Sequence, residues 1–195
     1  MLTRQAALDK LHELIKNSAL IHHCLCVETV MRSACEAYGT PDDNIEMWAL
    51  AGLLHDADWE KYPEDHPRIT VEWLHEIGET EIAYAVSAHF TQWGVPHVTQ
   101  MDKALVACDE LTGFVVACAR VRPDGIATLE PRSVIKKLKQ PKFAAGVSRE
   151  EVAAGIRLLG CDQEKHLQLI ISALRNNAEQ LGLHPPKAAD GDIGQ

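Results

Sequence analysis

The segment GLLHDADWEKYPEDHP, residues 52–67, ends an apolar run with a histidine beside an aspartate. His55 and Asp56 form this doublet, and a second pair, Asp65 and His66, follows ten residues later. Successive side chains on a helix diverge by roughly 100°, so two neighbours rarely share one contact in a core. Two neighbours can nevertheless bind one small ion where the last turn of a helix unwinds. The doublet therefore predicts a pair of metal ligands at a helix end.

Helical periodicity extends outward from this segment in both directions, and no stretch alternates apolar and polar residues convincingly as a half-buried strand would. Turn residues such as Gly39 and Gly78 separate the periodic stretches. The predicted helices cover residues 3–17, 20–38, 44–57, 68–77, 79–90, 99–121, 131–138, 148–159 and 162–181. The sequence thus predicts an all-α protein, a single-domain helical bundle over residues 1–183 with a flexible tail over residues 184–195.

Composition places the chain among compact globular proteins. Its 195 residues are 46% hydrophobic and 24% charged, which suits one domain with a sizeable core. The formal net charge of −9 argues against an extended nucleic-acid partner, and no apolar run reaches the roughly 18 to 20 residues that span a bilayer. The six cysteines form no CxxC pair and follow no leader sequence, so we expect reduced, mostly buried thiols in a cytoplasmic protein. The oligomeric state stays open.

Two more candidate ligands lie on other predicted helices. His23 shares a helical face with Val27, and Asp109 lies in the middle of a long apolar helix. A single histidine in such a place is more often a hydrogen-bonded core residue, but a buried aspartate must be paired or bound to metal. Together with His55 and Asp56 these residues supply two imidazoles and two carboxylates. That set of ligands suits one divalent ion of Mn, Fe, Ni, Co or Zn.

The ordered set of a histidine, a His-Asp doublet and a distant aspartate, all on helices, resembles the HD-domain superfamily of metal-dependent phosphohydrolases. The similarity covers roughly residues 15–120 and is strongest to a small bacterial subgroup of HD-domain hydrolases. It rests on HHCLCVETVMR (22–32), LAGLLHDADWE (50–60) and ALVACDELTGFVVA (104–117), which carry His23, His55-Asp56 and Asp109. The resemblance implies that these four residues bind the metal in a helical core over about residues 15–120.

Members of this family that bind two metals have two further histidines between the doublet and the last aspartate. His66 in EDHP and His89 in SAHF occupy these places in order, so they would bind a second ion or contact phosphate. Together with Asp58 and Glu110 they are also the candidate acid–base residues. His66 and His89 are the first choice, because Glu110 directly follows a ligand and would point away from the ion. His66 is equally consistent with an exposed turn, because the family often has a lysine after the doublet where this chain has ADWEK.

A basic segment follows the last ligand helix. From Arg120 to Arg149 the chain carries eight basic and two acidic residues, and this segment opens a basic helical C-terminal part over residues 121–183. A solvated helix face would explain such a run equally well. We predict that the segment folds over the mouth of the site and binds an anionic substrate through Lys136, Lys142 and Arg149.

A divalent ion with these ligands would polarise a phosphoryl oxygen and activate a bound water near neutral pH. The leading hypothesis is therefore a phosphohydrolase acting on a phosphate ester or anhydride of a small molecule, such as a nucleotide. Two alternatives stay open. One is an oxygenase of HD-like fold with two irons, which needs His66 and His89 as ligands, and the other is a non-catalytic metal-binding regulatory module.

Overall fold

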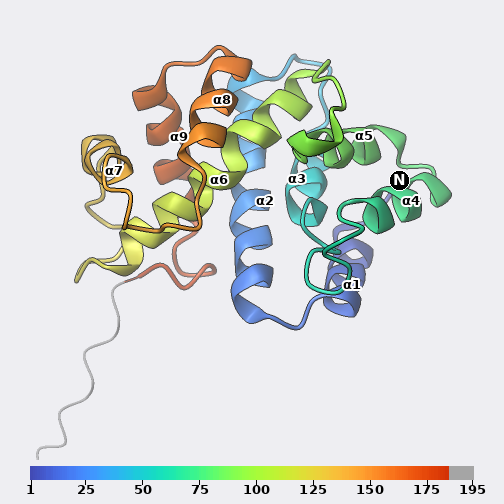
Figure 1. Ribbon diagram of the computed structural model, residues 1–195, viewed down its shortest axis with the longest axis horizontal. Coiled ribbons are helices and arrows are strands. Elements are labelled where there is room, and N and C mark those ends of the chain that lie inside the picture. The colour runs from blue at the N-terminus through green and yellow to red at the C-terminus, as the bar shows by residue number, and fades with distance from the viewer. Residues whose placement is uncertain (185–195) are drawn as a thin grey trace, which may run out of the picture.

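The computed structural model describes residues 1–184, and in that range all regular structure is helical (Figure 1). The elements are α1 (Arg4–Leu14), α2 (Ser18–Tyr38), α3 (Ile45–Leu54), α4 (Arg68–Glu76), α5 (Thr80–His89), the 3₁₀ turn η1 (Thr91–Trp93), α6 (Gln100–Arg120), α7 (Pro131–Leu138), α8 (Arg149–Leu159) and α9 (Gln163–Asn176). The prediction of an all-α protein is confirmed. The predicted tail begins at His184, and its other residues lie outside the described part of the chain.

Side-chain caps fix several helix starts close to the predicted ones. Thr3, Asn17 and Asp162 each accept a hydrogen bond from a backbone N–H in the first turn of α1, α2 and α9, respectively. The end of α9 differs from the prediction, since the helix stops at Asn176 instead of Leu181 and turns follow. The predicted starts of these helices therefore agree with the structure more closely than the predicted end of α9 does.

The packing of α3 on α2 determines where the His-Asp doublet lies. α3 ends at Leu54, so the doublet lies in the turns that follow and not inside a helix over residues 44–57. A Cβ atom at Gly52 would lie 2.9 Å from Val27 O, which shows how closely the two helices approach. Val27 is one helical turn from His23 on α2. This close contact therefore brings the end of α3 beside His23.

α6 packs against α2, α5, α8 and α9 in the middle of the molecule (Figure 1). Gly155 allows the closest approach of α8, because a Cβ atom at this position would lie 2.7 Å from Ala107 Cα. Ser148, the N-cap of α8, also donates its backbone N–H to Glu110 Oε2 at 3.1 Å. These contacts place the first turn of α8 beside the middle of α6.

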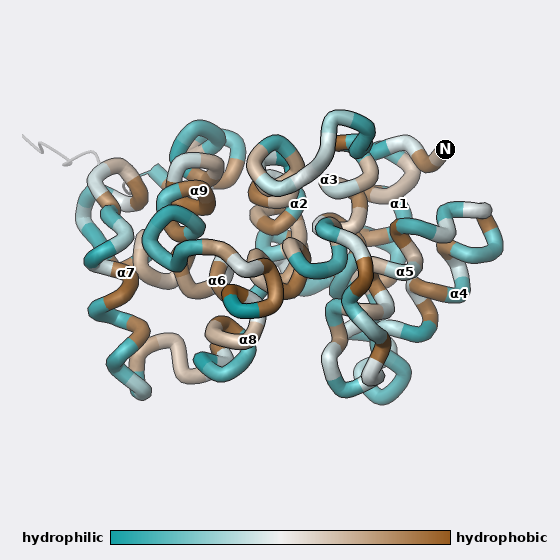
Figure 2. The backbone as a smooth tube through the Cα atoms, turned by 90° about the horizontal axis from the view of Figure 1, so that it is seen from above, coloured by the Kyte–Doolittle hydropathy of each residue, from teal (hydrophilic) through white to brown (hydrophobic). Residues whose placement is uncertain are grey.

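One cluster of buried hydrophobic side chains extends from Ala7 to Leu183 and receives residues from all nine α-helices of the described range. Trp48 and Phe114 are among its largest members. All six cysteines are free thiols and five are buried, as predicted. Figure 2 shows hydrophobic and hydrophilic residues alternating along the peripheral helices α4, α7 and α9, as expected of helices with one buried face. Within residues 1–184, none of the helices is both long and apolar enough to cross a membrane.

Candidate metal centre

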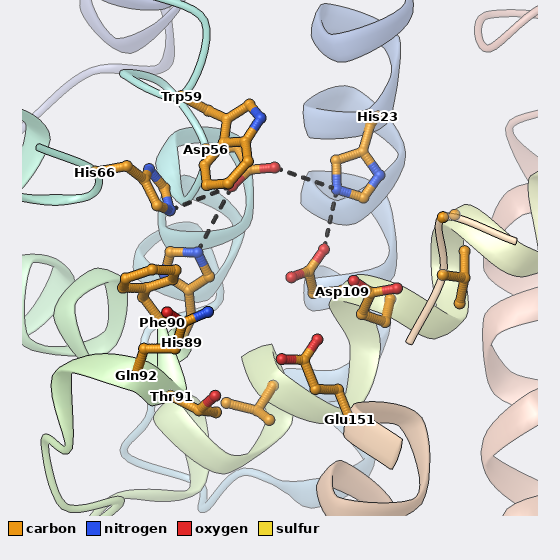
Figure 3. A pocket seen from close by; sticks show the side chains of 15 residues that line it. His23, Asp56, Trp59, His66, His89, Phe90, Thr91, Gln92, Asp109 and Glu151 are labelled. Carbon is orange, nitrogen blue, oxygen red and sulfur yellow. Dashed lines mark hydrogen bonds and ion pairs between the residues drawn. The ribbon is translucent and has the colours of Figure 1, made fainter. Parts of the chain in front are cut away.

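Segments that are distant in the sequence bring six candidate ligands together around one small volume, and Figure 3 labels all of them except His55. They are His23 on α2, His55 and Asp56 after α3, His66 before α4, His89 at the end of α5 and Asp109 on α6. The structure thus places all four predicted metal ligands beside the two additional histidines. Five of them form two groups that share Asp56, and Asp109 adjoins the first group through its contacts with His23 and His55.

The first group consists of His23, His55, Asp56 and Asp109. His23 Nε2 lies 3.0 Å from Asp109 Oδ1 and 3.2 Å from His55 Nε2, which in turn lies 3.3 Å from Asp56 Oδ2. Atoms that bind one ion at about 2.1 Å lie roughly 3 to 3.5 Å from one another, so these separations suit a metal ion. His55 Nδ1 donates to Gly52 O at 2.8 Å, which leaves the lone pair of Nε2 facing the other ligands.

The second group consists of Asp56, His66 and His89. Asp56 Oδ1 lies 3.6 Å from His66 Nε2 and 3.6 Å from His89 Nε2, whereas Asp56 Oδ2 faces the first group. His89 Nδ1 donates to Val86 O at 2.5 Å, so Nε2 is again the atom that is free to bind an ion. A carboxylate with one oxygen in each group is placed to bridge two ions.

Asp58, the third predicted catalytic residue, lies behind His66 and does not line the open part of the site. Its side chain is fully buried. Oδ1 accepts a 2.7 Å hydrogen bond from His66 Nδ1, and Oδ2 accepts a 2.8 Å hydrogen bond from Thr70 N. Because both oxygens are occupied, this position differs from the one expected of an acid–base group. Asp58 is instead placed to orient the imidazole ring of His66.

In the first group, attraction between opposite charges shifts the pKa values more than burial does. Desolvation alone would lower the pKa of His55, but Asp56 and Asp109 raise that pKa well above its ordinary value. Burial alone would raise the pKa of Asp56 and of Asp109, but the neighbouring histidines hold both well below the ordinary range. Two ionised carboxylates therefore face the space between the imidazoles, where they would equally stabilise a divalent cation.

A pocket of about 390 Å³ opens beside the two groups (Figure 3). Trp59 and Phe90 supply aromatic surface, and each packs edge-on against His66, with ring centroids 4.9 and 5.1 Å away, respectively. Two glutamates, Glu110 and Glu151, also line the pocket. Among residues 1–184, no lysine or arginine does so. The pocket is therefore acidic and aromatic apart from its histidines and a few small or neutral side chains.

Glu110, an acid–base candidate expected to point away from the ion, lines the pocket instead, and Glu151 was not predicted to belong to the site. Burial, and then the negative charge of Asp109, raise the pKa of Glu110 to about 7. Glu151 lies in the first turn of α8, and Figure 3 shows its carboxylate pointing toward Asp109. The packing of α8 on α6 brings Glu151 to the pocket, and no spacing in the sequence signals that contact.

The basic residues predicted to bind substrate lie elsewhere. The Arg149 guanidinium donates to the carbonyl oxygens of Gln140, Phe143, Ala144 and Val147, and it packs on the Phe114 ring at 4.9 Å. Lys136 and Lys142 are exposed. None of the three lines the pocket. Their positions therefore do not support the prediction that they bind an anionic substrate, because Arg149 stabilises its own loop and the two lysines are exposed to solvent.

The family model of the HD domain matches residues 20–116 of the chain. No curated protein and no solved structure matches it. The matched range contains all six residues of the two candidate ligand groups. On this evidence, the chain belongs to the HD-domain superfamily.

Proposed function

We propose that the protein is a metal-dependent phosphohydrolase in which each ligand group binds one divalent ion. The observation that carries this proposal is the position of Asp56, whose two oxygens face different groups of histidines. The other residues of each group would complete the ligands of its ion. Imidazole and carboxylate ligands together suit Mn, Fe, Ni, Co or Zn.

Bound divalent ions would supply a polarised phosphoryl oxygen and an activated water. The chain's own residues hold the ligands for this task, because the Nδ1 atoms of His55, His66 and His89 all donate to fixed acceptors and so aim each Nε2 at the centre. We accordingly assign His66 and His89 to the second ion as ligands in preference to acid–base roles. A volume of about 390 Å³ suits a small phosphorylated molecule better than an extended polymer.

One observation also favours a second function. His66 and His89 face Asp56 and Asp109 faces His23 and His55, so the chain brings together the six residues that a di-iron oxygenase of HD-like fold would need. Iron in the purified protein, with consumption of oxygen and no release of phosphate, would identify that activity. Bound metal with neither reaction would identify a regulatory module.

The experiment that tests the proposal combines metal analysis with an assay of phosphate release. The native protein, loaded with Mn²⁺, Co²⁺ or Ni²⁺, should release phosphate from at least one member of a panel of phosphate esters and anhydrides, and chelation should abolish the release. Asp109→Asn should lose this activity because it removes one negative ligand of the first group. Asp9→Asn, an exposed substitution on α1, is the matched control. Absence of release by the metal-loaded native protein would exclude the phosphohydrolase.

A further inference from the structure

Two glutamates line the pocket at the end opposite the His-Asp doublet. Figure 3 shows Asp56 at one end of the pocket and Glu151 at the other. Glu110 lines the same pocket, and one of its oxygens accepts the backbone N–H of Ser148. Arg149, two residues before Glu151, directs its guanidinium to carbonyl oxygens of its own loop. The described chain therefore provides no lysine or arginine inside the pocket to neutralise the two glutamates.

Carboxylates in a confined pocket favour a cationic group, because an anion beside them would force them to bind a proton or leave their charge uncompensated. The exposed ring of Trp59 packs on His66 and lies beside Asp56, at the other end of the pocket (Figure 3), so the selection for a cation depends on the two glutamates.

We infer that the substrate is a phosphorylated amine, whose ammonium group binds Glu110 and Glu151 while its phosphate faces the candidate metal centre. This inference rests on the proposed function and names its substrate class. Two divalent ions would exceed the charge of Asp56 and Asp109, so one end of the pocket would attract phosphate and the other end an ammonium group. A nucleotide lacks an ammonium group, and the further phosphates of a nucleoside di- or triphosphate would lie against the glutamates.

A pair of small probes tests the inference directly. Phosphoethanolamine and ethyl phosphate have the same phosphate monoester on two carbons and differ by the ammonium group. We expect the Mn²⁺-loaded protein to bind phosphoethanolamine at least about 10-fold more tightly in isothermal titration calorimetry. Glu151→Gln, which keeps the shape of the side chain, should bring the ratio of the two affinities close to one.

Glu150→Gln is the matched control, since Glu150 lies beside Glu151 in the first turn of α8 but is exposed and does not line the pocket. It should retain the native ratio of affinities. Glu110→Gln is a second variant that should lower the ratio. Equal binding of the two probes by the native protein, binding of neither, or the same ratio in Glu151→Gln as in Glu150→Gln would overturn the inference.

Release of phosphate, measured on the same samples, reports separately on the proposed function. Selective binding of phosphoethanolamine without release would uphold the inference about the ligand and exclude the hydrolase. Release from both probes with equal kcat/KM and equal affinities would uphold the hydrolase and exclude the preference for an amine.

Discussion

His66 Nδ1 donates a 2.7 Å hydrogen bond to Asp58 Oδ1, and this contact joins the second ligand group to a carboxylate outside the pocket. Asp58 is held in turn by Thr70 N in α4 at 2.8 Å. The direction of the His66 ring therefore depends on a residue that touches neither the pocket nor the first group. Such supporting hydrogen bonds fix the tautomer and the orientation of a histidine that binds metal.

Asp58→Asn should weaken binding of the second ion by about 10- to 100-fold, because an asparagine accepts only one of the two N–H donors that Asp58 satisfies. Equilibrium dialysis followed by elemental analysis should show occupancy falling from two ions per chain toward one. Asp65→Asn is the control, since Asp65 lies in the same loop but is only half-buried, does not line the pocket and pairs with Arg68 at 2.6 Å. Full occupancy of both sites in Asp58→Asn would contradict this prediction.

Metal stoichiometry in two further variants should reveal whether Asp56 bridges the groups. Asp56→Ala removes ligand atoms from both groups, so we expect it to lose both ions. His89→Gln affects the second group alone and should retain one ion. Elemental analysis of the purified, metal-loaded proteins measures both outcomes. Retention of one ion by Asp56→Ala would show that the two groups do not share this carboxylate.

The four predicted metal ligands could be identified from sequence because each one depends on local features. His23 and Asp109 lie on helices whose periodicity is clear, and the doublet follows an apolar run that marks a buried helix. The resemblance of their order to the HD-domain pattern then implied that they meet. The all-α fold could be predicted for the same reason, since caps, turns and periodicity are properties of short segments.

The residues that local patterns could not place depend on contacts between helices. Glu151 reaches the pocket only because Gly155 lets α8 approach α6 closely, and these helices are separated in the chain by α7. Arg149 belongs to a basic run in the sequence, but its guanidinium donates hydrogen bonds to backbone carbonyl groups that come together only in the folded loop. Charge patterning indicates which residues are basic and not what each one contacts.

Gly155→Ala should destabilise the protein by about 1–3 kcal/mol, because the added Cβ would lie 2.7 Å from Ala107 Cα and 2.8 Å from Val106 O. Urea unfolding followed by circular dichroism measures the change. Gly146→Ala is the control, since nothing lies within 4 Å of a Cβ atom at that position. Equal stability of the two variants would show that α8 is free to shift away from α6.

Arg149→Met should destabilise the protein by about 2–3 kcal/mol, because the carbonyl groups of residues 140–147 lose a charged donor. Lys142→Ala, an exposed substitution in the same loop, should change stability by no more than about 0.5 kcal/mol. Thermal unfolding measures both values. Faster proteolysis within residues 140–147 in Arg149→Met alone would show that the destabilisation arises in this loop. Equal stability of the two variants would contradict the prediction.

Because of His166, the free energy of unfolding should decrease as the pH falls below neutrality. It is fully buried on α9, where Nε2 donates to Ala107 O at 3.1 Å and Nδ1 accepts from the Tyr38 hydroxyl at 3.0 Å. Burial lowers the pKa of this histidine below its ordinary value of 6.5. Between that value and the lowered native pKa the unfolded chain binds one more proton, so stability decreases by up to about 1.4 kcal/mol per pH unit as the pH falls.

His166→Gln isolates this contribution, because an amide retains a donor for Ala107 O but does not titrate. The variant should be less stable than the native protein near pH 7, and the difference should shrink as the pH falls toward about 5. Urea unfolding of both proteins at several pH values, with equal metal loading, measures the difference directly. Other histidines and the candidate metal ligands titrate in both proteins, so their effects cancel in the comparison. A difference in stability that stays constant across this range would show that His166 binds a proton equally well in the folded and unfolded chain.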